Sequence, residues 1–338
     1  MSDLTTYIGH TAGIYDIPVE TLEKECLDFL HTGSESGFQH LRLVLDTVMD
    51  ARRGALTDVK IRALKGPSDD HFGALHEIAD VIGSTIEADP AISEWARPYA
   101  IGHAWRVSRD IEFAIEALQA ASPGEETSAA VLEVGSAPYL FTLYMQQQGY
   151  NVHGLDLDPT RQRNLIDQNA LTVITHDLEG DDPGADLIDQ YDLIVFNEVF
   201  EHLRINPLKT LRKLHSWLKP GGKLILSTPN AQSLDGFRKY ITPGVMFGLG
   251  AIPVVEYGKL ETIGHMGHVR EYTAPEVMHT LKHTGFITEV LTYRFSPAQL
   301  ETIVIPHVHA RWGSDMIFTC RKGQMPDAAP AHSEDSHD

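Results

Sequence analysis

Two glutamates and a histidine follow the apolar run YDLIVF at residues 191–196. Glu198, Glu201 and His202 stand at positions i, i+3 and i+4, which share one face if a helix begins there. Two carboxylates and an imidazole on one face suit Mg²⁺, Mn²⁺, Fe²⁺ or Zn²⁺ as ligands. The alternative is that the carboxylates only stabilise a helix amino terminus, where negative charge is favourable. The spacing leaves both interpretations open.

A second histidine-containing stretch, GHMGHVREYTAPEV at residues 264–277, offers a further imidazole. His268 is the preferred candidate and His265 the fallback, and TAPE at 273–276 predicts the start of the next helix. In the absence of a metal, His202 or His268 is the candidate general base, because the ordinary pKa of imidazole is about 6.5. The candidate catalytic residues are therefore Glu201, His202 and His268.

The second half of the chain alternates short β-branched runs with helical segments. Seven runs read as strands: AAVLEV, YNVHGLDL, LTVITHD, YDLIVFN, GKLILSTP, FITEVLTYRF and SDMIFTCR. Between them, YLFTLYMQQQ, TRQRNLIDQNA and PLKTLRKLHSWL have helical character. Alternation of this kind predicts an α/β fold with a doubly wound, Rossmann-like, mostly parallel seven-stranded sheet.

The first part of the chain has helical periodicity. Apolar stripes recur through HFGALHEIADVIGSTIEAD, through IGHAWRVSRDIEFAIEALQA and from Phe38 to Val48, and no strand-like alternation interrupts them. ASPGEETSA at 121–129 suits a linker. We therefore expect an all-helical domain over 1–122, which completes the acceptor pocket or forms a homodimer interface. A second domain over 123–325 and a disordered acidic tail over 326–338 follow.

In a doubly wound sheet the ligand lies beyond the carboxyl ends of the strands. Gly135 ends the first strand of the α/β half and allows a tight turn with close backbone approach. Asp156 follows at the end of the next strand, where a carboxylate would hold a ribose diol. Asp177 closes the third strand, where it could meet an amino group on a base.

Residues 129–322 resemble the class I S-adenosylmethionine-dependent methyltransferases. The most specific motifs are NEVFEHL and LKPGGKLILSTPN, in that order. The resemblance implies S-adenosylmethionine as cofactor. It assigns the methionine end to Glu133 and Gly135 with Ser136 and Ala137, the ribose to Asp156 with Leu157 beside it, the adenine to Asp177 and Leu178, and the pocket floor to Asn197. The first loop departs from the family's Gly-x-Gly-x-Gly, because Ala137 and Tyr139 stand at the second and third glycine positions.

Glu-x-x-Glu-His followed by a distant His-x-x-Glu-aromatic-Thr is similar to a narrower group, the metal-dependent O-methyltransferases. Ubiquinone-pathway catechol O-methyltransferases and small-RNA 2′-O-methyltransferases belong to it. The resemblance implies that Glu198, Glu201, His202 and His268 hold Mg²⁺ or another divalent cation, which grips the accepting oxygen. A divalent cation lowers the pKa of a hydroxyl and orients it, while the protein aligns nucleophile and methyl group.

A long glycine-containing stretch separates the two motifs. Residues 231–267 are long for a connection in a compact domain, which predicts a lid or binding loop. Its aromatic and basic residues could line an acceptor pocket or could be core of a packed subdomain. The residues concerned are Phe237, Arg238, Lys239, Tyr240, Phe247 and Tyr257, with Arg270 beyond the loop.

Composition limits the partners. The formal net charge of −20 argues against nucleic acid and against an anionic membrane surface. The sequence shows no signal peptide and no apolar run of about 18 residues. Cys26 and Cys320 are the two cysteines, too few for a disulfide framework, so we expect a cytoplasmic protein with reduced thiols.

These observations predict a methyltransferase acting on a hydroxyl oxygen of a small molecule or glycoconjugate, with metal assistance. Three alternatives stay open. They are a metal-independent N- or S-methyltransferase with a histidine base, an NAD-dependent oxidoreductase, and a scaffold of the same fold without catalytic activity.

Overall fold

A computed structural model describes the chain over residues 8–9, 11–13, 17–32, 44, 59–65, 69–86, 90–121, 123–233, 236, 267–295 and 313–326. The strands are β1 (Lys60–Lys65), β2 (Val131–Val134), β3 (Val152–Asp156), β4 (Val173–Thr175), β5 (Tyr191–Asn197), β6 (Leu218–Pro229), β7 (Phe286–Phe295) and β8 (Asp315–Lys322). The α-helices are α2 (Val19–Thr32), α4 (Asp69–Ile86), α5 (Pro90–Ala121), α6 (Leu140–Gln147), α7 (Arg163–Gln168), α8 (Pro207–Trp217) and α11 (Ala274–His283). Three short 3-10 helices are η1 (Pro159–Gln162), η2 (Ala185–Leu187) and η3 (Phe200–His202).

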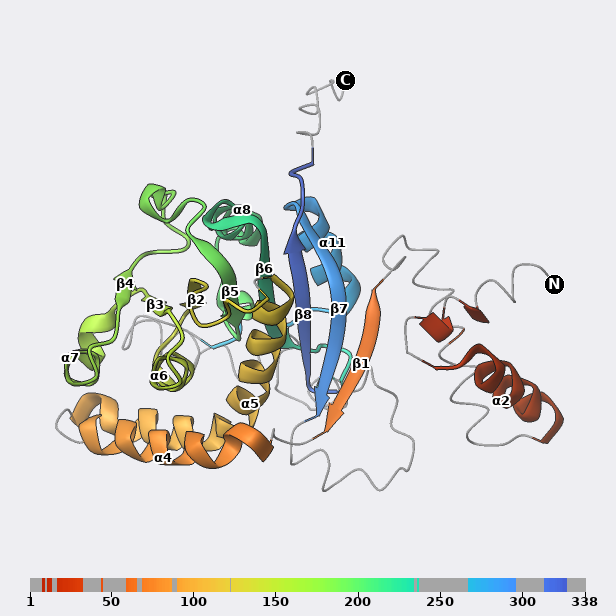
Figure 1. Cartoon of the computed structure of the whole chain (residues 1–338), viewed down its shortest axis with the longest axis horizontal. Coiled ribbons are helices and arrows are strands. Elements are labelled where there is room, and N and C mark those ends of the chain that lie inside the picture. The colour runs from red at the N-terminus through yellow and green to blue at the C-terminus, as the bar shows by residue number, and fades with distance from the viewer. Residues whose placement is uncertain are drawn as a thin grey trace, which may run out of the picture.

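All eight of these strands form one sheet in the order β1-β7-β8-β6-β5-β2-β3-β4 (Figure 1). Only β8 runs antiparallel to its neighbours, β6 and β7. The predicted α/β fold with a mostly parallel sheet is therefore confirmed. Each of the seven predicted strand runs forms a strand, and β7 coincides with the run FITEVLTYRF.

The predicted strand count of seven is wrong, and so is the all-helical description of residues 1–122. The additional strand β1, with the sequence KIRALK, pairs in parallel with β7 from Lys60↔Val290 to Lys65↔Phe295. The sequence did not indicate a strand because apolar–polar alternation breaks at Ala63 and Leu64. The hydrogen bonds that make this segment a strand come from β7, more than 200 positions away.

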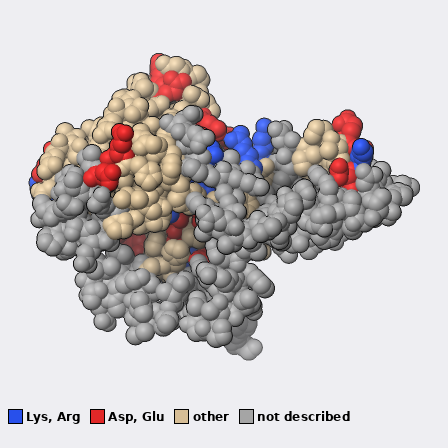
Figure 2. Space-filling model, turned by 90° about the horizontal axis from the view of Figure 1, so that it is seen from below, with Lys and Arg blue, Asp and Glu red and all other residues tan. Residues whose placement is uncertain are grey.

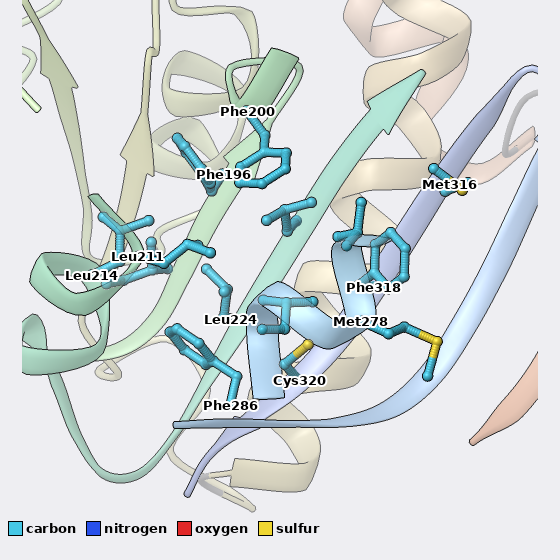
Figure 3. Close-up of a cluster of buried hydrophobic side chains, with 14 of the residues drawn as sticks. Phe196, Phe200, Leu211, Leu214, Leu224, Met278, Phe286, Met316, Phe318 and Cys320 are labelled. Atoms are coloured by element: carbon cyan, nitrogen blue, oxygen red, sulfur yellow. The ribbon is translucent and has the colours of Figure 1, made fainter. Parts of the chain in front are cut away.

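Helices cover both faces of the sheet, and β5 shows how the two sides alternate. Leu193 and Val195 pack in a hydrophobic cluster with α4, α5 and α6, whereas Ile194 and Phe196 pack in a second cluster with α8 and α11. Figure 3 shows part of the second cluster, where Phe196 and Leu224 lie near Leu211 and Leu214 of α8. This alternation is what a strand buried on both faces requires.

Helices form in the predicted stretches, α4 over residues 71–86 and α5 over 101–120, and residues 87–89 lie outside the described part of the chain. Their apolar residues Leu75, Ile82, Ile111 and Leu118 are fully buried in the same cluster as Val131 of β2. Hydrophobic packing thus runs across position 122, where we placed a domain boundary, and that division stays a prediction. The stripe from Phe38 to Val48 lies outside the described residues except for Val44, which packs with Leu22 and Cys26 of α2.

Local signals set the ends of the helices that flank the candidate site. Asn206 precedes α8 and its side chain accepts hydrogen bonds from the backbone N–H groups of Leu208 and Lys209. At the start of α11, the backbone N–H of Thr273 donates to Glu276 Oε2 at 2.8 Å, as the TAPE motif predicts. Among the described helices, none is long and apolar enough to cross a membrane.

Candidate functional site

The strand order reverses between β2 and β5. From β2 the chain proceeds outward to β3 and β4, and it then returns to β5 on the other side of β2. Because β2, β3 and β5 are parallel, their carboxyl ends meet at one edge of the sheet. Gly135, Asp156 and Asn197 lie there, one at the end of each strand. A ligand site is expected at such a reversal.

Gly135 turns the chain sharply after β2. Its φ is 71°, a left-handed conformation that favours glycine, and its N–H donates to the carbonyl of Leu155 at 2.8 Å. A Cβ at this position would lie 2.5 Å from Cγ2 of Val199 in the loop after β5. The tight turn predicted at Gly135 is confirmed, and glycine is also needed because the loops after β2 and β5 touch here.

Tyr139 stands where the related loop carries its third glycine. Its φ of 68° is also left-handed, so the backbone takes the conformation that glycine would take. Its ring is fully buried in the cluster with α4, α5 and α6, and its hydroxyl has no hydrogen-bond partner in the described part of the chain. The departure from the glycine pattern is therefore accommodated by ring burial. A left-handed backbone costs a non-glycine residue about 1–2 kcal/mol.

Asp156 ends β3 with its carboxylate held by two backbone N–H groups. Oδ2 accepts from Ala137 at 3.3 Å and Oδ1 from Asp158 at 3.0 Å, so the glycine loop and the turn after β3 orient it. The side chain of Ser136 is buried against Gly154, where an added Cβ would lie 2.7 Å from Ser136 Oγ. Leu157, beside Asp156, is 57% exposed.

Asp177 and Leu178 lie in the loop after β4, and side chains of α8 hold this loop through hydrogen bonds to its carbonyl groups. Lys213 Nζ donates to the carbonyl of Gly180 at 2.8 Å and to that of Asp177 at 3.3 Å. Thr210 Oγ1 donates to the carbonyl of Leu178 at 3.4 Å. The Asp177 carboxylate accepts from the backbone N–H of Glu179 at 2.9 Å.

Two side chains at this edge, Glu133 and Asn197, favour a polar ligand for different reasons, because Glu133 has no cationic partner among the described residues and Asn197 has no hydrogen-bond partner there. Glu133 Oε2 accepts from the backbone N–H of Thr142 at 3.1 Å and also from the Thr142 hydroxyl. The pKa of Glu133 is raised to about 8, chiefly by burial and to a smaller extent by the charges of Asp110 and Asp156, while the two Thr142 hydrogen bonds act to lower it. The amide oxygen and nitrogen of Asn197 are buried with no hydrogen-bond partner among the described residues. Such groups favour a polar ligand beside them.

Glu201, His202 and His268 converge beside this edge. One ligand atom of each lies within 4.8 Å of the other two. The Nε2 atoms of His202 and His268 are each 3.9 Å from Glu201 Oε1. Backbone hydrogen bonds help to hold the group together, because the N–H of Val269 donates to the carbonyl of Glu201 at 2.8 Å.

Each of the two imidazoles has its Nδ1 at an oxygen acceptor. His202 Nδ1 lies 3.0 Å from the carbonyl oxygen of Gly267, and His268 Nδ1 lies 3.1 Å from Glu271 Oε1. These partners place the proton of a neutral imidazole on Nδ1 and the lone pair on Nε2, the atom that faces Glu201. Metal-ligating histidines usually have such a partner on their other nitrogen.

Glu201 is buried, and its Oε1 has no hydrogen-bond partner within the described ranges. Its Oε2 accepts from Thr228 Oγ1 at 2.9 Å. Burial, followed by the negative charge of Glu198, raises the pKa of Glu201 well above its ordinary value. One oxygen and two imidazole nitrogens form a donor set that fits a divalent transition metal.

Glu198 lies outside this group, so three of the four predicted ligands come together. Glu198 Oε2 pairs with Arg106 Nη1 at 3.2 Å, and Oε1 accepts from Ser227 Oγ at 2.7 Å and from Arg294 Nη2 at 3.4 Å. The expectation of a helix beginning at Glu198 is wrong. Glu198 has a left-handed φ of 56°, residues 200–202 form the 3-10 helix η3, and α8 begins at Pro207.

Sequence reasoning missed the arginines around Glu198. Arg106 lies on α5, in the part of the chain that the resemblance does not cover, and Arg294 is the penultimate residue of β7, a run that was predicted only as a strand. The i, i+4 spacing of Arg106 and Asp110 was a usable signal, because it puts both on one face of a helix. His265, Phe237, Arg238, Lys239, Tyr240, Phe247 and Tyr257 lie outside the described residues. Arg270 is described and pairs with Glu276.

A family model described as a methyltransferase domain matches residues 106–289, more than half of the chain. The chain belongs to this methyltransferase family. The predicted membership among class I S-adenosylmethionine-dependent methyltransferases is confirmed at this level. The match begins at residue 106, within α5.

Curated relatives match about a third of this methyltransferase chain. A ubiquinone biosynthesis O-methyltransferase of Xanthomonas euvesicatoria pv. vesicatoria is 34% identical over 116 residues, which cover 31% of this chain and 45% of that protein. Another, from Pseudomonas aeruginosa, is 28% identical over 103 residues, which cover 30% and 44%. The chain spans less than half the length of these relatives. A solved S-adenosylmethionine-dependent methyltransferase from Archaeoglobus fulgidus is similar with a TM-score of 0.45 and 14% identity, covering 66% of this chain and 99% of that one.

Proposed function

We propose that this protein transfers the methyl group of S-adenosylmethionine to a hydroxyl oxygen of a small molecule or glycoconjugate, with a divalent cation at Glu201, His202 and His268. The observation that carries the proposal is the convergence of these three side chains beside the edge formed by β2, β3 and β5. The similarity to curated relatives that are ubiquinone biosynthesis O-methyltransferases favours oxygen as the acceptor atom.

The cofactor assignments follow the polar groups at that edge. Asp156, oriented by two backbone N–H groups, would accept hydrogen bonds from the ribose hydroxyls. Glu133 would pair with the ammonium group at the methionine end, because its buried carboxyl has no cationic partner among the described residues. Asn197 would bond the cofactor at the pocket floor, and Asp177 with Leu178 would meet the adenine. S-adenosylmethionine, when bound, supplies a methyl group on a positively charged sulfur.

The three-residue cation site would prepare the acceptor. A divalent cation, when bound, lowers the pKa of a hydroxyl and orients it. The chain's own residues supply the ligand atoms, and Gly267, Glu271 and Thr228 hold these side chains in place through the hydrogen bonds described above. In a reaction without metal, His202 or His268 would instead take the proton from the acceptor.

Calorimetric titration of Mn²⁺ into the protein saturated with S-adenosylhomocysteine tests the proposal. We expect Mn²⁺ to bind to the wild type and to show no measurable binding to Glu201→Gln, because the variant removes the only anionic ligand of the cluster. Glu289→Gln is the matched control. The Glu289 carboxylate lies near the start of β7, where it pairs with Lys223 and Arg321 and not with the proposed ligands.

Three other outcomes would contradict part or all of the proposal. Nucleoside binding without Mn²⁺ binding would favour the metal-independent N- or S-methyltransferase with a histidine base. Binding of NAD in place of S-adenosylhomocysteine would favour the oxidoreductase. Failure to bind either ligand would favour a scaffold without catalytic activity.

A further inference from the structure

Glu198 belongs to a largely buried charge cluster that joins four parts of the fold, namely the loop after β5, α5, β7 and β8. Besides Glu198, the cluster contains Arg106 and Asp110 of α5, Arg294 of β7 and Asp315 of β8. Arg294 is fully buried, and its guanidinium binds Asp110 at 2.7 Å, Asp315 at 3.1 Å and Glu198 at 3.4 Å. The remaining contact is that of Arg106 with Glu198 at 3.2 Å.

Helix α5 is attached to this cluster at two points one turn apart. Arg106 contacts Glu198 directly, and Asp110 contacts it through Arg294. The Arg294 guanidinium also lies over the ring of Trp105, with its central carbon 5.4 Å from the ring centre. The cluster therefore joins one face of α5 to the turn that leads into Glu201 and His202.

The partners of Glu198 compete with any role in metal binding. Both acceptor positions of Oε1 are in use, by Ser227 and Arg294, and Oε2 faces the Arg106 guanidinium. Turning this carboxylate toward a cation would leave Arg106 with no carboxylate partner among the described residues. Removing one partner of a buried ion pair is strongly destabilising.

We propose that Glu198 is a positioning residue that anchors α5 over the site, and that a bound cation takes Glu201, His202 and His268 without Glu198. The anchoring rests on the contacts alone, whereas the ligand set rests on the proposed function. The two glutamates of the Glu-x-x-Glu-His motif thus have different roles. Glu198 balances arginine charge and Glu201 offers an oxygen to a cation.

Hydrogen exchange of the full-length protein tests the anchor. In Glu198→Gln and Arg106→Met, we expect the backbone amides of residues 103–113 to exchange about tenfold faster or more than in the wild type, because the ion pair that holds this part of α5 is lost. Arg106→Lys keeps the charge and should restore part of the protection. Arg109→Met is the matched control, because Arg109 pairs with Glu112 on the same helix and should leave the exchange unchanged.

Mn²⁺ titration of the same variants tests the ligand set. We expect Glu198→Gln to retain Mn²⁺ affinity within about threefold of the wild type, while Glu201→Gln loses binding. Unchanged exchange of α5 in both Glu198→Gln and Arg106→Met would overturn the anchor. A loss of Mn²⁺ affinity in Glu198→Gln equal to that in Glu201→Gln would overturn the ligand set.

Two further results keep this inference separate from the proposed function. If the wild type binds no Mn²⁺, the metal part of the proposed function fails together with the ligand set, and the exchange of α5 still decides the anchor. If Glu198→Gln does not fold, Arg106→Met and Arg106→Lys test the same contact from the helix side.

Discussion

Three glutamates near the carboxyl edge of the sheet, of which Glu201 is buried and Glu133 and Glu198 are partly buried, differ in what surrounds them. Glu133 accepts hydrogen bonds from Thr142, Glu198 pairs with two arginines, and Glu201 faces two histidines with one oxygen lacking a hydrogen-bond partner among the described residues. The pKa of Glu198 is lowered by Arg106 and Arg294 against the opposing effect of burial, whereas the pKa of Glu133 and of Glu201 is raised, chiefly by burial. Neighbouring charges therefore decide which carboxyl stays ionised and which needs a cationic ligand.

The buried carboxyl of Glu133 predicts a pH dependence of stability. Its pKa in the folded protein is about 8, above its ordinary value of 4.5. Its stabilising contribution is therefore fully present below about pH 4.5 and is lost as the pH rises to about 8. We expect Glu133→Gln to flatten the fall in thermal unfolding temperature of the ligand-free protein between about pH 5 and 8. Glu77→Gln, at an exposed position on α4, is the control, and parallel profiles for Glu133→Gln and wild type would refute the assignment.

Asp156 predicts a specific loss of cofactor affinity. Replacing Asp156 by alanine removes a charged hydrogen-bond acceptor for the ribose, so we expect the affinity for S-adenosylhomocysteine to fall by about 10- to 100-fold in calorimetry. Asp167→Ala is the control, because Asp167 is exposed and pairs with Arg163 within α7. An affinity of Asp156→Ala within about twofold of the wild type would disprove the ribose assignment.

At the scale of elements, the site depends on two loops that touch. The turn after β2 passes so close to the loop after β5 that Gly135 has no room for a Cβ beside Val199. The loop after β5 carries Glu198, Glu201 and His202, so the Gly135–Val199 contact joins the turn after β2 to the group formed by Glu201, His202 and His268. Helix α5 is also attached to the loop after β5, because Arg106 forms an ion pair with Glu198.

A set of glycine variants separates backbone strain from this contact. Gly124 has a φ of 81° with nothing within 4 Å of an added Cβ, so Gly124→Ala measures strain alone and should cost about 1–2 kcal/mol of unfolding free energy. We expect Gly135→Ala to cost at least about 1 kcal/mol more, because its Cβ would overlap Val199. Urea unfolding measures both.

Adding Val199→Ala tests the cause of that excess. In a double-mutant cycle with Val199→Ala alone as reference, the second substitution should recover most of the excess cost. Equal costs for Gly124→Ala and Gly135→Ala would contradict the contact.

At the scale of the whole molecule, the excess of acidic over basic residues limits the kinds of partner. On the face shown in Figure 2, most of the described surface is uncharged, and acidic residues are visible within a recess. The net charge of −20 opposes binding of a polyanion, which requires clustered Lys and Arg. A small-molecule or glycoconjugate acceptor and a homodimer through the N-terminal helices remain proposals.

The charge predicts that RNA is not a partner. We expect no change in fluorescence anisotropy of a labelled 20-nucleotide RNA with up to about 10 µM protein at about 0.15 M salt, because few cationic groups are available to release counterions. A basic RNA-binding protein in the same buffer serves as the positive control. Saturable binding in this range would contradict the expectation and would reopen the RNA acceptor.

Much of the fold could be predicted from the sequence because its signals are local. Periodicity identified β2 to β8 and the helices within α4 and α5, and the TAPE motif marked the start of α11. Parallel strands then bring Gly135, Asp156 and Asn197, the residues proposed to bind the cofactor, to one edge of the sheet without any knowledge of side-chain contacts. The sequence alone therefore determined the α/β class and the end of the sheet that carries the site.

Only the tertiary structure decided the roles of the individual carboxylates and of the segment before residue 122. Arg294 and Asp110 are 184 positions apart in the chain, and no local pattern links them. Strand β1 forms because it pairs with the edge of β7, and Glu198 lies apart from Glu201, His202 and His268 because it pairs with Arg106 and Arg294. Charge pairing in a buried environment depends on which groups meet in space, and that is set by packing rather than by spacing along the chain.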